Sequence, residues 1–115
     1  MVVDSLSEDE VDRIFQALAD ATRRHILIRT SHRGESVSTL AGHYPMSFAA
    51  VQKHVAVLER AALVTKQRHG REQIVQANPA TLRKASDLLD AYEQLWIQRA
   101  HQIADILAGE EGDPT

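Results

Sequence analysis

An amphipathic helix that passes directly into two extended runs is the feature that most restricts the fold of this chain. Apolar residues recur every three or four positions from Val51 through Val55 and Leu58 to Ala62, which predicts one buried stripe on a helix capped by Ser47. After this helix the pattern becomes extended, and Gly70 separates two such runs. Because glycine accepts a positive φ at little cost, the pattern predicts a β-hairpin over residues 63–77.

Three helix signals precede this segment and one follows it. The predicted N-caps are Ser7 (in a capping box with Glu10), Asp20 or Thr22, Ser38, and Asn78 before Pro79. We expect the second helix to end near Thr30, the third before Pro45 and the last near Leu107. This order predicts a mainly α fold with a small β-hairpin: a winged helix-turn-helix with a long C-terminal dimerisation helix. We expect a single DNA-binding domain over residues 1–108, with the terminal helices forming the dimer interface, and a flexible acidic tail over residues 109–115.

Composition excludes several classes of protein. Cysteine is absent, which excludes disulfides, thiolate metal sites and a cysteine nucleophile. No apolar run approaches the roughly 20 residues that span a membrane, so no membrane partner is expected. The opening residues also lack the basic flank and apolar stretch of a signal peptide. We therefore expect a cytoplasmic protein.

The net charge of −3 conceals an uneven distribution along the chain. Residues 22–35 and 47–77 each carry a net charge of +3, whereas residues 1–21 and 78–115 carry −5 and −4. A polyanion responds to the local field, so the basic centre is compatible with nucleic-acid binding. A mixed surface that only confers solubility is the alternative interpretation.

The exposed face of the helix after Ser47 is the first candidate site. Helical geometry turns Ala49, Gln52 and Lys53 outward and places Phe48 at the entry turn. In a helix-turn-helix, the N-terminal residues of the second helix reach base edges in the major groove. The Gln52 amide can pair with adenine, Lys53 can reach guanine or phosphate, and the two apolar residues can contact a thymine methyl. The alternative is a plain surface helix.

The predicted hairpin carries a second group of basic residues. Lys66 and Arg68 alternate to one face of its first strand, and His69 and Arg71 lie at its tip. A basic tip beside a groove-reading helix can bind phosphates and release counterions. The alternative is an exposed hairpin that charge keeps soluble.

The last predicted helix carries an apolar seam with a period of seven residues. Such a seam is typical of a helix that packs against another helix, and only Arg99 interrupts it. We expect an isologous homodimer, whose two-fold symmetry would require a palindromic operator. The alternative is that the helix covers only its own domain. The expected dimer contacts are Leu82, Leu89, Tyr92, Trp96 and Ile103.

Several segments, in consistent order and spacing over residues 14–100, resemble the ArsR-type winged-helix regulators. Residues 18–27 read LADATRRHIL and resemble that family's LADPTRR-x-IL opening. Residues 37–64 read VSTLAGHYPMSFAAVQKHVAVLERAALV and resemble its MS-x-x-A-V-x-KHL-x-VLE-x-AGLV block. Residues 68–82 read RHGREQIVQANPATL and resemble its R-x-GR wing and the N/D-P-x-x-L that follows. The resemblance implies a dimeric transcription factor, usually a repressor.

The resemblance also implies roles for single residues. The family's base-reading positions fall on Phe48, Ala49, Gln52 and Lys53, and its wing contacts fall on Arg68 and Arg71. Ser47 and His54 belong to the same candidate DNA-binding helix, where His54 is expected to pack or hydrogen-bond rather than read bases. Gln52 and Phe48 depart from the family's usual residues, so the operator should differ. Ala62 replaces the family's glycine, which removes the easy left-handed helix end.

Metal-dependent and catalytic functions find little support in the sequence. His101 and Asp105 are one helical turn apart and could share an ion, but the residues around them do not complete the family's zinc site. No G-x-S-x-G elbow or phosphate-binding glycine loop is present, so no enzyme, cofactor or metal is expected. We therefore expect a DNA-binding repressor. The alternatives are a protein–protein interaction module, and a sensor with a ligand pocket near Trp96 and Tyr92 and an unknown effector.

Overall fold

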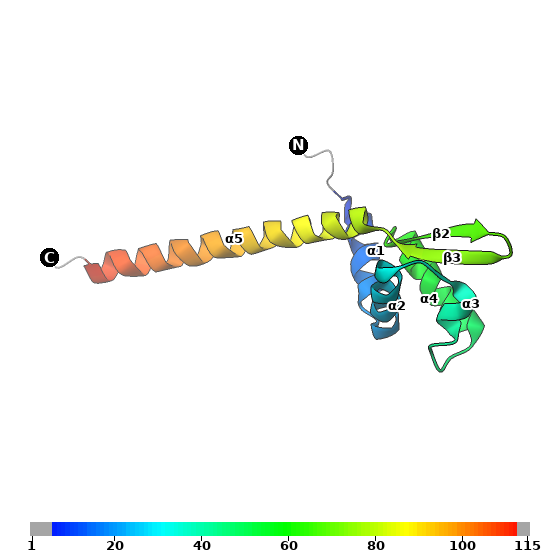
Figure 1. The fold of residues 1–115 in the computed structure, drawn as a ribbon. Helices are drawn as coiled ribbons and strands as arrows, with labels where there is room; N and C mark the ends of the chain where they lie inside the picture. Colours follow the sequence, from blue (N-terminus) through cyan, green and yellow to red (C-terminus); the bar gives the residue numbers. More distant parts are fainter. Residues whose placement is uncertain (1–5, 113–115) are drawn as a thin grey trace. The chain divides into compact units, whose positions relative to one another are not determined.

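The computed structural model describes the backbone of residues 6–112 and the side chains of residues 6–109. It divides into two compact units, Met1–Ala85 and Ser86–Thr115, which are considered separately. The elements in chain order are α1 (Glu8–Leu18), α2 (Ala21–His32), β1 (Glu35–Ser36), α3 (Val37–Ala41), α4 (Phe48–Arg60), β2 (Val64–His69), β3 (Glu72–Ala77) and α5 (Pro79–Gly112), as Figure 1 shows. This order confirms the predicted winged helix-turn-helix with a long C-terminal helix.

Most of the predicted helix starts are confirmed by their capping hydrogen bonds. The Ser7 hydroxyl accepts from the Glu10 N–H at 3.1 Å, and the Ser7 N–H donates to the Glu10 carboxylate at 2.9 Å. Asp20, rather than Thr22, caps α2 by accepting from the Arg23 N–H at 3.0 Å. These bonds satisfy N–H groups that have no partner inside the helix.

The predicted start of α3 is wrong by two residues. Ser36 is the N-cap, and its hydroxyl accepts from the Thr39 N–H at 3.0 Å. The sequence favoured Ser38, because nothing in the local pattern indicates that residues 35–36 form a strand. That strand, β1, pairs with β3 through Glu35 and Ser36 and holds Ser36 in the extended conformation that an N-cap requires.

The sheet has the order β1-β3-β2 and is antiparallel throughout. The hairpin of β2 and β3 is confirmed, and its register pairs Val64 with Ala77 and His69 with Glu72. Gly70 lies at the turn with a φ of 63°, the left-handed conformation that glycine adopts without a Cβ clash.

One hydrophobic core joins the helices of the first unit to the base of the sheet. The buried stripe of α4 that the sequence predicted is confirmed, because Val51, Val55 and Leu58 are each at most 1% exposed. The core side chains around this stripe are Ile14, Ala17, Ile26, Leu27, Val37, Leu40, Ala61, Leu63, Val64, Val75 and Ala85. Burial of this stripe therefore fixes which residues of α4 face outward.

The end of α4 departs from the prediction. Ala62 was expected to continue the inward stripe, but it is exposed, and Ala61 is buried in its place. Ala62 has a φ of 59°, its N–H donates to the Glu59 carbonyl, and the Leu63 N–H donates to the Leu58 carbonyl. These are the two hydrogen bonds of a Schellman motif, made here with alanine where glycine is usual.

The last helix is longer than predicted. The sequence predicted an end near Leu107 and a tail from residue 109, whereas α5 continues through Gly112. Alanine and glutamate are strong helix formers, and a single glycine costs only about 1 kcal/mol in a helix. Residues 113–115 of the predicted tail lie outside the described residues.

Candidate nucleic-acid interface

The exposed face of α4 carries the residues that the sequence singled out. Ser47 caps the helix, and its hydroxyl accepts from the Ala50 N–H at 3.1 Å. Ala49, Gln52 and Lys53 are exposed on the side opposite the buried stripe. Phe48 is 47% exposed at the first helical position. The fold therefore presents these four side chains to solvent as one continuous strip at the N-terminal end of α4.

His54 faces into the protein rather than outward with this strip. Its Nδ1 accepts from the Arg23 guanidinium at 3.2 Å and lies 3.8 Å from the Asp20 carboxylate. Arg23 also donates to the carbonyl oxygens of Gln16 and Ala17, at 2.9 and 2.8 Å. His54 therefore links α4 to the end of α1 and the start of α2, a contact that orients α4.

An ion pair between the partly exposed Arg29 and the buried Glu35 fixes the segment between α2 and α4. Arg29 donates to both carboxylate oxygens of Glu35 at 3.0 Å, and Glu35 is only 8% exposed. The same guanidinium donates to Nε2 of His43 at 2.8 Å. The bidentate bond from Arg29 lowers the pKa of Glu35 against the opposing effect of its burial. Next to this pair, the hydroxyl of Tyr44 is buried without a hydrogen-bond partner in the described structure, and burial raises its pKa.

Three of the four arginines of residues 22–35, Arg23, Arg24 and Arg29, have structural partners that the sequence did not indicate. The Arg24 guanidinium donates to the Leu18 carbonyl at 2.7 Å, so Arg23 and Arg24 together bind the last carbonyl groups of α1. No basic residue lies in the last turn of α1 itself. These guanidinium groups keep their charge, but they are held against the carbonyl end of α1 and are less free to reach a polyanion. The only signal in the sequence was Asp20, a cap placed three residues before the first of these arginines.

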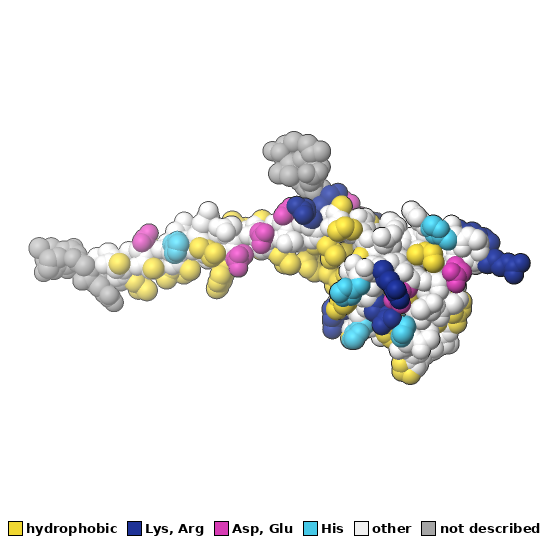
Figure 2. Space-filling model, viewed as in Figure 1, with side chains coloured by type: hydrophobic (Ala, Val, Ile, Leu, Met, Phe, Trp, Pro, Cys, Tyr) yellow, Lys and Arg dark blue, Asp and Glu magenta, His cyan; other side chains and the backbone are white. Residues whose placement is uncertain are grey.

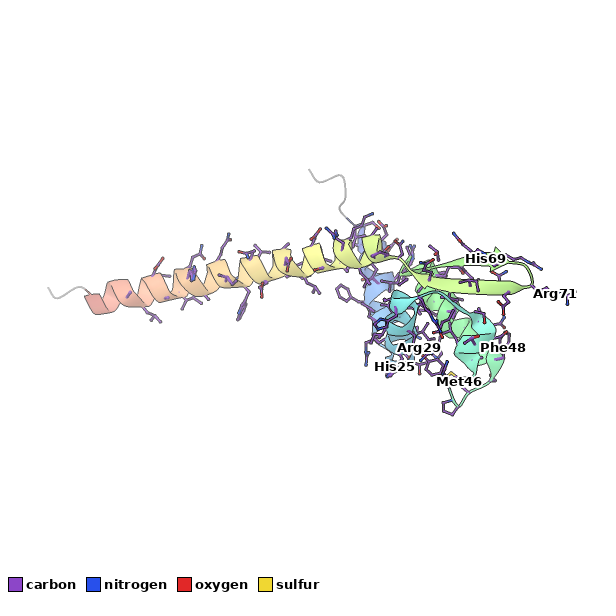
Figure 3. The ribbon with its side chains drawn as sticks, in the orientation of Figure 1. His25, Arg29, Met46, Phe48, His69 and Arg71 are labelled. Carbon is purple, nitrogen blue, oxygen red and sulfur yellow. The ribbon has the colours of Figure 1, made fainter. Side chains whose placement is uncertain are left out.

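The hairpin presents basic side chains toward its tip. Arg68, His69 and Arg71 are exposed, and Figure 2 shows Lys and Arg side chains gathered there. In the view of Figure 3, Arg71 at the tip and Phe48 at the start of α4 lie toward the same edge of the first unit. The Arg68 guanidinium donates to the Gly70 carbonyl at 3.2 Å, and the Lys66 ammonium lies 3.7 Å from the Glu59 carboxylate. Lys66 is therefore partly neutralised.

In the second unit, α5 carries an exposed apolar face. Leu89, Tyr92, Trp96 and Ile103 are 50%, 53%, 73% and 54% exposed, and Figure 2 shows hydrophobic side chains along this helix. Leu82, the first residue of the predicted seam, is partly buried and packs against the core of the first unit. Isolated surface leucines need no explanation, but a continuous apolar face is typical of an interaction surface.

The two candidate metal ligands, His101 and Asp105, are both exposed on α5. Within the part of the chain that the structure describes, no group of three or more His, Cys, Asp or Glu side chains is arranged to hold a metal ion. Among the described helices, none combines the length and apolar character needed to cross a membrane.

Comparisons with known proteins agree with this architecture. The HTH-type transcriptional regulator Rv2034 of Mycobacterium tuberculosis is 36% identical over 104 residues, which cover 90% of this chain and 94% of the relative. An ArsR-like transcriptional regulator from Rhodococcus sp. RHA1 is 34% identical, with a TM-score of 0.78 over 85% of this chain and 92% of that structure. The homodimeric winged helix-turn-helix DNA-binding domain of Mb0332 from Mycobacterium bovis is 25% identical, with a TM-score of 0.60 over 76% and 82% of the two chains.

No protein-family model matches the chain. Two of these relatives are more than 30% identical to the chain over most of their length, which is sufficient to assign a family. The order of the helices and strands and the motifs of residues 18–82 agree with that assignment. The chain belongs to the ArsR family of winged helix-turn-helix transcriptional regulators.

Proposed function

We propose that this protein binds a palindromic DNA operator as a homodimer and represses transcription by occupying promoter DNA. The observation that carries the proposal is the strip of Phe48, Ala49, Gln52 and Lys53, exposed at the N-terminal end of a helix whose opposite side is fully buried. A helix held in this way can enter the major groove without disturbing the core. The Mycobacterium bovis structure, named as a homodimeric DNA-binding domain, supports DNA binding and dimerisation.

Base reading is assigned to the side chains of this strip. The Gln52 amide offers the donor and acceptor pair that adenine presents in the major groove, and Lys53 can donate to guanine or to phosphate. Phe48 and Ala49 offer apolar surface to a thymine methyl. His54 acts indirectly, because its bond to Arg23 sets how α4 is held.

Phosphate binding is assigned to the hairpin. Arg68, His69 and Arg71 are exposed near its tip and can contact the DNA backbone beside the groove that α4 occupies. Lys66 contributes less, because Glu59 is its ion-pair partner. These contacts would raise the affinity for every DNA sequence and make it depend on salt.

Dimerisation is assigned to the exposed apolar face of α5. Leu89, Tyr92, Trp96 and Ile103 would be covered by the same face of a second copy, as two-fold symmetry requires. Two equivalent reading helices would then contact half-sites about 34 Å apart, or a multiple of that distance. The symmetry is the reason for expecting a palindrome.

Paired substitutions test this division of labour. Gln52→Ala with Lys53→Ala should weaken binding to the operator by about 1–3 kcal/mol per lost base contact and weaken binding to random DNA much less. Arg68→Gln with Arg71→Gln should weaken binding to both DNAs and flatten the salt dependence. Arg83→Gln serves as the control, because Arg83 is exposed and belongs neither to the base-reading residues nor to the phosphate-binding residues.

Fluorescence anisotropy with labelled operator and random duplexes, repeated over a salt series, measures all four proteins. Equal losses on both DNAs for both pairs would contradict the assigned roles. Absence of binding to any DNA by the wild-type protein would favour a protein–protein interaction module instead, since Phe48 and Ala49 would then present an apolar docking strip.

A further inference from the structure

The first unit has a cavity that lies apart from the candidate DNA interface. A cavity of about 280 Å³ opens between the N-terminal half of α1, the C-terminal end of α4 and the start of α5. Its lining includes Glu10, Arg13, Arg60, Thr81 and Lys84. Arg60 is the last residue of α4, so the cavity lies at the opposite end of this helix, about 20 Å long, from its base-reading strip.

Three cationic side chains converge on this cavity from three different elements. Arg13 comes from α1, Arg60 from α4 and Lys84 from α5. None of them belongs to an ion pair within the described structure, where every ion pair involves other residues. Glu10 is the one carboxylate among the lining residues, so the three cations outnumber it, and an anion placed between them would relieve their mutual repulsion.

The one carboxylate beside the cavity is already engaged. Glu10 accepts from the Ser7 N–H at 2.9 Å as part of the capping box of α1. Hydrogen bonds from Ser7 lower the pKa of Glu10, and the charges of Lys84 and Arg13 lower it further. Glu10 therefore feels the positive charges of Lys84 and Arg13, but within the described structure it forms no ion pair with either of them.

The inner wall of the cavity is apolar and carries one hydroxyl. Ile14 and Ala61 are 1% and 6% exposed, so they form a floor from which water gains few hydrogen bonds. The Thr81 hydroxyl is also buried and accepts from the Asn78 amide at 3.2 Å, which leaves its own proton available to donate. An apolar floor with a few convergent polar groups is typical of a small-molecule site.

We propose that this cavity binds a small organic anion, with its carboxylate or phosphate group among Arg13, Arg60 and Lys84 and its apolar part against Ile14 and Ala61. The volume limits the ligand to a small molecule, because pockets for drug-sized ligands start at about 300 Å³. The guanidinium groups are suited to either acid group, since both present the paired oxygens that arginine binds.

The position of the cavity would allow a bound anion to affect DNA binding. Arg60, Ala61 and Ala62 line it and form the joint between α4 and β2, the two elements assigned to DNA. A bound anion would therefore contact the joint that sets their relative placement. This consequence rests on the proposed function, whereas the binding of the anion does not.

Calorimetric titration of the full chain tests the proposal with phenyl phosphate and benzoate as probes and benzyl alcohol as the uncharged analogue. We expect at least one of the two anions to bind saturably at one site per chain, and the analogue not to bind. The anion that binds more tightly shows whether the site prefers a phosphate or a carboxylate group. Arg60→Gln and Lys84→Gln should each weaken binding about tenfold, whereas Arg83→Gln, an exposed neighbour outside the cavity lining, should change it less than twofold.

Circular dichroism checks that each variant is folded, which is expected because all three side chains are exposed. Failure of both anions to saturate, or an equal loss of affinity in Arg83→Gln, would overturn the proposal, as would equal affinity for benzyl alcohol. No DNA is present in the titration. Loss of anion binding and loss of DNA binding are therefore separate results, and either can occur without the other.

Discussion

Replacing Ala62 by glycine should stabilise this protein, although the substitution removes a methyl group. Ala62 has a φ of 59° at the Schellman end of α4. The left-handed conformation costs a non-glycine residue roughly 1–2 kcal/mol. Glycine removes that cost but gains freedom in the unfolded chain, which offsets about 0.4–1 kcal/mol. Because the Ala62 side chain is exposed, little packing is lost, and the net gain should be about 0.5–1 kcal/mol.

The assay is thermal and urea unfolding at equal protein concentration, since an associating protein has a concentration-dependent midpoint. The expected rise in Tm is about 2–4 °C for a chain of this size. Ala19→Gly is the matched control, because Ala19 is also an exposed residue at a helix end but has a φ of −74°. There glycine should destabilise by about 0.5–1 kcal/mol. If both substitutions destabilise equally, the account of how α4 ends is refuted.

Three further predictions concern the ion pair, the α5 face and the sheet. Glu35→Gln should cost about 1–2 kcal/mol at pH 7. The pKa of Glu35 is lowered below its ordinary value of 4.5 by Arg29, so the ion pair stabilises the fold above that pH. Urea unfolding at pH 7 and pH 3 should therefore show the variant and wild type converging at low pH, and a constant difference would contradict this. Trp96→Asp should shift the mass measured by light scattering to the 12.8 kDa monomer, and a persistent dimer would exclude this face as the interface. Gly34→Ala would place a Cβ 2.9 Å from the Ile74 side chain and should lower urea stability by about 1 kcal/mol, whereas an unchanged midpoint would show that Ile74 yields freely.

Much of the fold could be predicted because its signals are local. The stripe of Val51, Val55 and Leu58 has the period of a helix, and burial of that stripe decides which side chains face outward. Ser7 and Ser47 cap their helices through bonds that span only three residues. The exposed strip of α4 follows from these same periodicities, so its composition could be predicted before the structure.

The features that could not be predicted depend on contacts between distant segments. A strand as short as β1 has no period of its own, and only its pairing with Val75 and Ile74 defines it. The partner of His54, Arg23, is 31 residues away in the sequence. The cavity likewise brings Arg13, Arg60 and Lys84 together from three elements, and nothing in their spacing indicates that they meet.

The most direct test of the central claim is the affinity for DNA immediately upstream of the protein's own gene, compared with random DNA of equal length. Fluorescence anisotropy from about 50 to 200 mM salt measures both, because phosphate contacts make affinity fall steeply over this range. We predict selective binding to the upstream DNA, about a thousandfold tighter than to random DNA, with a steep salt dependence. Weak binding to both DNAs with no dependence on salt would contradict the assignment of α4 and the hairpin to DNA.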